Sequence, residues 1–191
     1  CVVPDDRRFI SDVFVPKKAA FGARHGQKVV GRITQYPRDN RDNPEGEVVQ
    51  VLGYPDDKDV DMLSVALSMG VRTQFPSEVT ARAAKLPTEV SEKDIANRRD
   101  LRDETIFTID GDDAKDLDDA VSVALNSDGT YTLGVHIADV SNYVKPGDDI
   151  DKEAFMRGTS VYFPQNVFPM LPTELSNGVC SLYEGVDRLT L

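Results

Sequence analysis

The stretch TIFTIDGDDAKDLDDAVSV, residues 105–123, places six aspartates between two apolar runs. All six lie between Asp110 and Asp119, and the flanking runs are IFTI and AVSVAL. Apolar, β-branched runs of this kind predict two strands, here joined by an acidic loop. Because each ionised carboxylate raises the cost of ionising the next, a folded chain that gathers so many of them must compensate their repulsion.

A bound divalent cation removes that cost. The loop offers only oxygen ligands, without histidine or cysteine, and oxygen ligands favour magnesium or manganese over zinc. Asp110 follows the first predicted strand, and the entry to the second carries three more aspartates, Asp116, Asp118 and Asp119. One loop can therefore bring four carboxylates to a common point. Magnesium bound in this way usually shares its shell with phosphate oxygens, as in phosphoryl-transfer sites.

Three other interpretations of the loop compete with a magnesium site. The plainest, a solvated acidic loop whose aspartates cap turns, stays open. A calcium-binding EF-hand that starts at Asp110 is excluded, because it requires glycine and glutamate where Lys115 and Val121 stand. A phosphatase of the haloacid-dehalogenase type is also excluded. Ala114 occupies the place of its threonine, and too few residues separate Asp110 from Gly147 to form its parallel sheet.

The composition suits a soluble globular chain of one domain, or of one small domain and part of a larger one. Of its 191 residues, 40% are hydrophobic and 29% charged. No apolar run approaches the roughly 20 residues that span a bilayer. The first residues show no basic region followed by an apolar run, so we do not expect secretion. With Cys1 and Cys180 as the two cysteines, at opposite ends, we expect a reducing, cytoplasmic compartment and no membrane partner.

Charge is unevenly distributed between two predicted domains, residues 1–53 and 54–191. The first carries 9 basic and 7 acidic residues, and the second carries 13 basic and 26 acidic ones. An acidic domain repels nucleic acid at long range. Any polyanion bound there therefore needs metal ions or basic neighbours.

The first predicted domain consists of short strands with glycine turns. The strands are expected at Phe9–Pro16, 27–36 and 46–53, with a polar loop at 37–46, and they suggest a small antiparallel barrel. The second begins with helices at 59–69, 76–86 and 91–101. We expect Ser77 to cap the second helix and Ser91 with Asp94 to form a capping box on the third. Strands at 104–109, 119–125 and 131–140 follow, the last two joined by a turn at 126–129, and then a helix at 148–160.

Four motifs in this order resemble the catalytic (RNB) domain of the ribonuclease II/ribonuclease R superfamily, and the first two are closer to the ribonuclease R branch. They are TIDGDDAKDLDDAVSV (108–123), GVHIADVSNYV (134–144), SVYFP (160–164) and PMLPTELSNGVCSL (169–182). Residues 2–16 and 25–33 resemble the second cold-shock domain that precedes it. The resemblance implies an α+β fold. An OB-type cold-shock β-barrel, truncated at its N-terminus, would be followed by the N-terminal part of a mixed α/β RNB nuclease domain.

The resemblance also implies an activity: magnesium-dependent, processive 3′-to-5′ exoribonuclease hydrolysis of RNA to nucleoside 5′-monophosphates. The family's four motif aspartates fall on Asp110, Asp116, Asp118 and Asp119, as metal ligands, with Asp118 and Asp119 also assigned to catalysis. Mg²⁺ is the expected cofactor, with Mn²⁺ as an alternative. The expected partner is the 3′ end of single-stranded RNA, and the sequence does not determine the oligomeric state.

Tyr162, in SVYFP, matches the family tyrosine that packs on the 3′-terminal nucleotide, and a core aromatic is the competing interpretation. In the cold-shock part Phe14 is the favoured RNA-binding aromatic, ahead of Phe9 and Phe21. The family's catalytic arginine, a second stacking aromatic and further RNA-binding domains are expected outside these residues. The chain is therefore expected to be a fragment with little activity by itself. The alternative function is a non-catalytic RNA-binding module with a structural acidic loop.

Other residues are expected to be structural. His136, in a predicted strand, is interpreted as a satisfied structural histidine, and Cys180 as a small buried residue. Arg98, Arg99 and Arg102 precede the first strand of the acidic stretch, and we expect them to pair with neighbouring acids rather than with RNA phosphates.

Overall fold

The computed structural model describes residues 1–37 and 43–191 and divides into two compact units, residues 1–73 and 74–191. This division lies beyond Gly53, because helix α1 (Val60–Ser68) packs against strand β2 (Glu45–Gly53) within the first unit. Each unit is described by itself. None of the described helices combines the length and the apolar character needed to cross a membrane.

In the first unit, strand β1 (Lys28–Gln35) pairs with β2 in antiparallel register, which confirms the two strands predicted there. Bulges interrupt the register. A short 3₁₀ turn, η1 (Lys17–Ala19), precedes them. Gly53 ends β2 with φ 132°, and a Cβ there would lie 2.8 Å from Asp57 Oδ2. Only glycine fits this corner without strain. The predicted polar loop at 37–46 lies partly outside the described residues.

The predicted strand at Phe9–Pro16 is wrong as a continuous element. It is reduced to two isolated bridges, Val13 with Val2 and Phe14 with Glu45. The preceding residues instead form a turn in which the Phe9 N–H donates to the Asp6 carbonyl. Alternation of apolar and polar residues produces a strand only where a neighbouring strand supplies hydrogen bonds.

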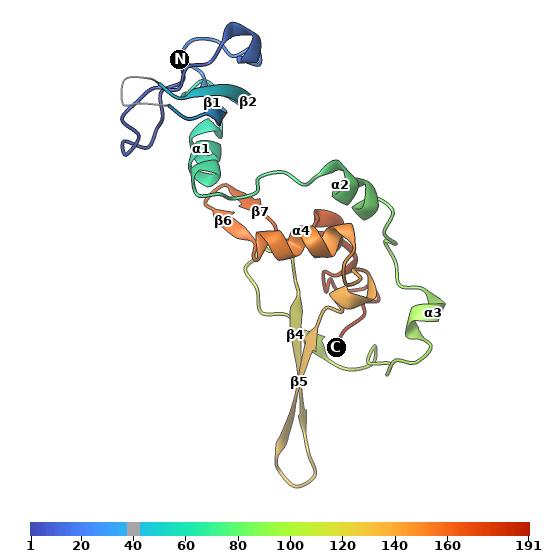
Figure 1. Ribbon diagram of the computed structural model, residues 1–191. Helices are drawn as coiled ribbons and strands as arrows, with labels where there is room; N and C mark the ends of the chain where they lie inside the picture. The colour runs from blue at the N-terminus through green and yellow to red at the C-terminus, as the bar shows by residue number, and fades with distance from the viewer. Residues whose placement is uncertain (38–42) are drawn as a thin grey trace. The chain divides into compact units, whose positions relative to one another are not determined.

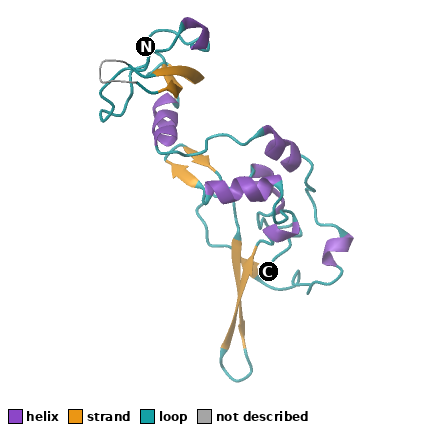
Figure 2. Cartoon of the chain, viewed as in Figure 1, coloured by secondary structure: helices purple, strands orange, loops and turns teal. Residues whose placement is uncertain are grey.

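The second unit combines three small helices with two small antiparallel sheets (Figures 1 and 2). One sheet has the order β3–β4–β5, and the other pairs β6 with β7. The predicted hairpin turn is confirmed, since the Asn126 N–H donates to the Thr130 carbonyl and Gly129 has φ 83°. The bounds are α2 (Ser77–Ala83), α3 (Glu92–Ile95), β3 (Ile106–Phe107), β4 (Asp119–Leu125), β5 (Tyr131–Ile137), η2 (Val140–Asn142), α4 (Asp149–Arg157), β6 (Val161–Phe163), β7 (Asn166–Phe168) and the π-helical turn η3 (Leu175–Val179).

The caps of these helices follow the sequence with one exception. The Ser91–Asp94 capping box on α3 is confirmed, and the Asp148 side chain accepts the Asp151 N–H at the start of α4. The predicted cap of α2 is wrong. Ser77 is the first helical residue, and its hydroxyl donates to the Glu78 carboxylate instead of accepting a backbone N–H.

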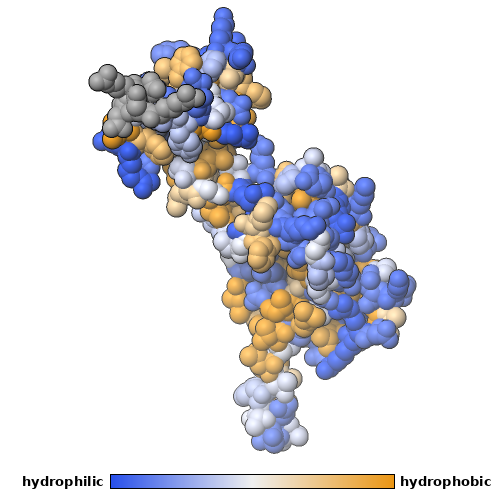
Figure 3. Space-filling model, viewed as in Figure 1, coloured by the Kyte–Doolittle hydropathy of each residue, from blue (hydrophilic) through white to orange (hydrophobic). Residues whose placement is uncertain are grey.

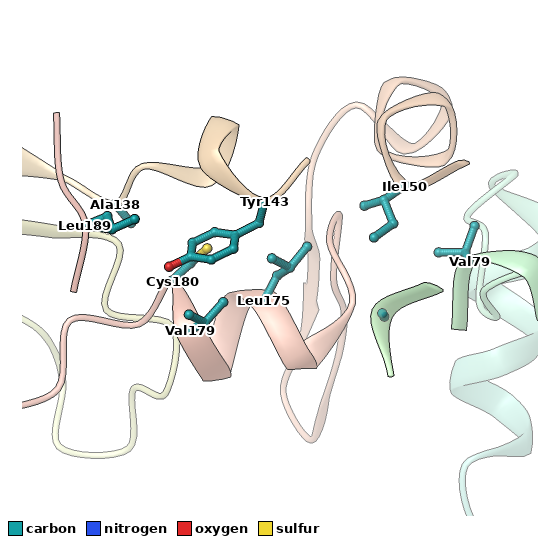
Figure 4. Packing of buried hydrophobic residues seen from close by; sticks show 9 residues of the cluster. Val79, Ala138, Tyr143, Ile150, Leu175, Val179, Cys180 and Leu189 are labelled. Atoms are coloured by element: carbon teal, nitrogen blue, oxygen red, sulfur yellow. The ribbon is translucent and has the colours of Figure 1, made fainter. Parts of the chain in front are cut away.

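One hydrophobic core holds the second unit together (Figure 4). It joins α2 and α4 to the segment after β5 and to the C-terminal residues around η3. Its buried members are Val79, Ala83, Ala138, Tyr143, Ile150, Leu175, Val179, Cys180 and Leu189. Packing of this cluster fixes residues 138–143 and 175–189, the two segments that border the acidic loop.

The β4–β5 hairpin leaves an apolar face exposed. Paired residues such as Val123 with Leu133 and Leu125 with Tyr131 share that face, and all four are exposed. Figure 3 shows apolar surface gathered at the base of this hairpin.

Candidate metal centre

The acidic loop, residues 108–118, joins β3 to β4. Strand β3 ends at Phe107 rather than at the predicted Ile109, because it pairs with β4 through two residues, Ile106 and Phe107. Asp110 therefore lies beyond the strand end and is exposed. The backbone near it is held by a turn in which the Ala114 N–H donates to the Gly111 carbonyl. We call residues 109–113 the open half of the loop.

The second part of the loop, residues 115–118, is fixed by the C-terminal segment, and we call it the clamped half. Ser181 Oγ donates to the Lys115 carbonyl at 2.9 Å and accepts the Leu117 N–H at 3.1 Å. The Tyr183 hydroxyl also donates to the Lys115 carbonyl, at 2.9 Å. The Leu182 N–H donates to the Leu117 carbonyl, at 2.8 Å.

Asp118 and Asp119, where the loop meets β4, are held by β5 and by the residue that follows it. The Ala138 N–H donates to the Asp118 carbonyl at 2.9 Å, and Asp119 opens β4 opposite Ile137. Asp118 and Asp119 are both exposed, whereas Asp116 is half-buried. The backbone of three of the four predicted ligands is therefore set by pairing with segments distant in sequence.

Tyr162, on β6, is brought to the same place. Its hydroxyl donates to Asp116 Oδ2 at 2.9 Å. This hydrogen bond, with smaller contributions from burial and from the charges of Asp116 and Asp118, raises the pKa of Tyr162. The residue as a whole is 65% exposed, which is compatible with access of a nucleotide to its ring. Tyr162 thus orients a predicted ligand carboxylate, a contact that its predicted stacking role does not include.

The four aspartates do not form a ready-made ligand cluster. Among the described residues, no group of three or more His, Cys, Asp or Glu side chains is arranged to hold a metal ion. The donor chemistry nevertheless suits a hard divalent cation. In the part of the chain that the structure describes, the carboxylates of Asp110, Asp118 and Asp119 make no side-chain hydrogen bond or ion pair. They are available to a cation, and the assignment of the four ligands stays a prediction.

Phe14, the predicted RNA-binding aromatic of the first unit, is exposed, as are Phe9 and Phe21. Its backbone is held by the Pro44 carbonyl and the Gly46 N–H. Lys17 and Lys18 lie on η1, close to it in sequence. Exposure of Phe14 is compatible with base stacking, and its role in RNA binding stays a prediction.

The histidine, the cysteine and the three arginines that we expected to be structural all have structural contacts. His136 Nε2 lies 2.9 Å from Ser122 Oγ across the β4–β5 pair, and a Cβ at Gly134 would lie 2.4 Å from the same oxygen. Cys180 is buried, and burial raises the pKa of its thiol to about 11. Four ion pairs made by the three arginines confirm the arginine prediction: Arg98 with Asp139, Arg99 with Glu104, and Arg102 with both Asp100 and Asp187.

Two residues have roles that the sequence did not predict, Asp139 and Ser181. Asp139 is a buried carboxylate. Burial alone would raise its pKa, but hydrogen bonds from Ser141 and Arg98 and the charge of Arg98 hold that pKa below the ordinary value. Ser181 is the other, and its only signal was its place within the motif that ends in NGVCSL. A serine in an apolar segment carries no spacing rule that would reveal its partner.

Comparison with known proteins places these elements in a family. The RNB domain family matches residues 98–191, and the cold shock domain family matches residues 2–76. Ribonuclease R of Thermotoga maritima is 52% identical over 192 residues, which cover 100% of this chain. Ribonuclease R of Escherichia coli K12 is 46% identical over 195 residues, again covering 100% of the chain. This chain belongs to the ribonuclease R family.

The match to the ribonuclease R family extends to solved structures. Mycoplasma genitalium RNase R in complex with double-stranded RNA superposes with a TM-score of 0.85 at 34% identity, over 96% of this chain and 32% of that one. Yeast Ssd1, a pseudonuclease, has a TM-score of 0.73 at 22% identity, over 99% of this chain and 24% of that one, and shares the fold. The predicted fold class, a cold-shock domain followed by a mixed α/β RNB region, is confirmed. The chain spans 27% of the T. maritima relative and 23% of the E. coli relative.

Proposed function

We propose that this chain carries the metal-binding loop of a processive 3′-to-5′ exoribonuclease. The enzyme hydrolyses single-stranded RNA to nucleoside 5′-monophosphates with Mg²⁺, or with Mn²⁺ in its place. The observation that carries the proposal is the clamped half of the acidic loop. There, Asp116 and Asp118 stand on a fixed backbone beside the Tyr162 hydroxyl, in a chain 52% identical to a ribonuclease R.

In this proposal Asp110, Asp116, Asp118 and Asp119 hold the ions. Divalent ions held there would neutralise charge in an in-line displacement at phosphorus, in which a water attacks and the 3′ oxygen leaves. Asp119, exposed at the first position of β4, and the neighbouring Asp118 are assigned the catalytic role. Tyr162 contributes twice: its hydroxyl orients Asp116, and its exposed ring packs on the terminal nucleotide.

RNA binding is shared with the cold-shock unit. Phe14 is proposed to stack a base, and Lys17 and Lys18 are proposed to contact phosphates, because stacking together with basic contacts is how OB-type domains bind single strands. RNase R of M. genitalium has been solved in complex with ribose methylated single-stranded RNA, at 34% identity to this chain. A cytoplasmic location is part of the proposal, since Cys1 and Cys180 are both free thiols.

Asp119→Asn tests the chemistry. The chain is placed in T. maritima ribonuclease R in exchange for the matching residues, and RNA turnover and RNA affinity are measured. Turnover should fall at least about 100-fold while RNA affinity stays nearly unchanged, because a metal ligand is lost and the cold-shock contacts remain. Asp112→Asn, in the open half, is the matched control and should retain turnover. Normal turnover by Asp119→Asn would refute the assignment of chemistry to this loop.

A non-catalytic RNA-binding module is the second candidate. It is favoured by the lack of a three-ligand group among the described residues. The two candidates differ in Mn²⁺ uptake by the unmodified 191-residue chain, measured by isothermal titration. The nuclease proposal expects uptake that Asp119→Asn weakens and Asp112→Asn does not. The module expects no uptake by any of the three proteins.

A further inference from the structure

Ser181 is the most completely buried polar side chain near the acidic loop, with an exposed fraction of 0%. Its hydroxyl uses both hydrogen-bonding directions, donating to the Lys115 carbonyl and accepting the Leu117 N–H. These two backbone groups flank Asp116. A single oxygen atom therefore fixes the chain on both sides of one predicted ligand.

Ser181 is itself rigidly held. Its N–H donates to the Gly178 carbonyl at 3.1 Å, and its carbonyl accepts Arg188 Nε at 2.8 Å. Its neighbour Cys180 belongs to the hydrophobic core. The packed core therefore fixes the Ser181 hydroxyl, and that hydroxyl in turn fixes the backbone of the loop. An alanine at 181 would keep the packing and lose both hydrogen bonds to the loop.

The loop needs such a restraint because its charges oppose assembly. Asp116, Asp118 and Asp119 lie within four consecutive positions, and like charges at this spacing repel one another. In the described chain no arginine or lysine side chain pairs with any of the three. The loop backbone is instead restrained by hydrogen bonds to the backbone groups of residues 115, 117 and 118. These bonds leave the carboxylate oxygens of Asp118 and Asp119 available for a cation. Holding ligands in place before the ion arrives lowers the ordering cost of binding.

We infer that Ser181, assisted by the Tyr183 hydroxyl, is a positioning residue that sets the backbone of residues 115–118 before any ion binds. Divalent-ion affinity then depends on a hydroxyl that never touches the ion. This inference rests on the proposed function, since it concerns the same four aspartates. It adds Ser181 as a determinant of metal affinity, more than sixty positions in sequence from Lys115 and Leu117, the residues that it bonds.

The experiment compares Mn²⁺ binding to the full 191-residue chain and to its Ser181→Ala variant. Isothermal titration is combined with peptide-level hydrogen exchange of the metal-free proteins. Ser181→Ala should lower Mn²⁺ affinity about 10-fold or more, as changes in residues that orient metal ligands do. It should also speed exchange in the peptide that contains Leu117, whose N–H loses its acceptor. Ser91→Ala, which removes the capping box of α3, is the matched control and should change neither quantity.

Tyr183→Phe covers the case in which Ser181→Ala does not fold. Tyr183 is partly exposed and loses only its hydroxyl, so a folded variant is expected, with a smaller decrease in Mn²⁺ affinity, about threefold. Unchanged affinity in a folded Ser181→Ala, or in Tyr183→Phe if the alanine variant is unfolded, overturns the inference while the proposed function stands. Absence of Mn²⁺ binding by the unmodified chain overturns the proposed function itself.

Discussion

The two halves of the acidic loop have similar composition and different restraint. The open half, residues 109–113, contains Asp110, Asp112 and Asp113, and its backbone makes one turn hydrogen bond in the part of the chain that the structure describes. The clamped half, residues 115–118, contains Asp116 and Asp118 and is bonded to Ser181, Leu182, Tyr183 and Ala138. The number of charges therefore does not decide how firmly each half of the loop is held. What decides it is whether segments anchored in the packed core supply hydrogen-bond partners to the backbone.

The comparison indicates how the site is assembled. Asp116, Asp118 and Asp119 stand on a fixed backbone, whereas Asp110 stands on a segment held by a turn. Among the described residues no three carboxylates are arranged to hold a metal ion. We therefore expect an ion that binds all four to reorient side chains in both halves and also to order the backbone around Asp110. Three further predictions test the contrast, in order of decreasing expected effect.

Hydrogen exchange should separate the halves most clearly. In the metal-free chain the amides of Leu117, Leu182 and Ala138 should exchange on the order of 100-fold more slowly than those of Gly111, Asp112 and Asp113, because the first three donate to loop or serine acceptors. The measurement is residue-resolved exchange by NMR. Added Mg²⁺, which is diamagnetic and leaves the NMR signals sharp, should slow exchange in the open half more than in the clamped half. Equal exchange in the two halves without metal would contradict the contrast.

Ser181→Ala should also destabilise the second unit. The Leu117 N–H would be left without its acceptor in a partly buried site, which costs about 1–3 kcal/mol of unfolding free energy. Denaturant unfolding, followed by circular dichroism, gives the value. Tyr183→Phe is the comparison variant and should cost less, because the Lys115 carbonyl keeps the Ser181 hydroxyl as a donor. A larger loss of unfolding free energy in Tyr183→Phe than in Ser181→Ala would show that the Tyr183 hydroxyl, and not that of Ser181, is the main restraint on the loop.

The smallest effect concerns the ionisation of Tyr162. Its pKa is raised chiefly by the hydrogen bond to Asp116, so folding favours the protonated phenol. The associated stability is complete below the ordinary tyrosine value of about 10 and is lost as pH rises through the higher folded pKa. Asp116→Ala should move that pKa back toward the ordinary value.

Ultraviolet absorbance of tyrosinate, with Tyr162→Phe subtracted to isolate this residue, measures the titration. Asp112→Ala serves as the control, because Asp112 does not contact Tyr162 in the described structure. A titration of Tyr162 that is indifferent to residue 116 would show that the hydrogen bond is not formed in solution.

Local signals predicted most elements of the second unit. The hairpin at 126–129, the capping box of Ser91 and Asp94, and the helix that begins after Asp148 each depend on residues close in sequence, and each is confirmed. The Ser77 cap of α2 is a local prediction that is wrong, but two other failures depend on residues distant in sequence. The strand at Phe9–Pro16 and the extension of β3 to Ile109 both required a partner strand, which local alternation cannot supply.

The sequence by itself determined the chemistry on offer: four aspartates at fixed spacing between two apolar runs, oxygen ligands only, and motifs that identify the ribonuclease R family. The tertiary structure alone decided which of these aspartates stand on a restrained backbone and which residues restrain them. Ser181 and Tyr162 reach the loop from 64 and 46 positions away, and no periodicity links residues so distant. Burial of Cys180, Val179 and Leu175 in one core brings the C-terminal segment against the loop, because apolar area leaves water only when distant segments pack together.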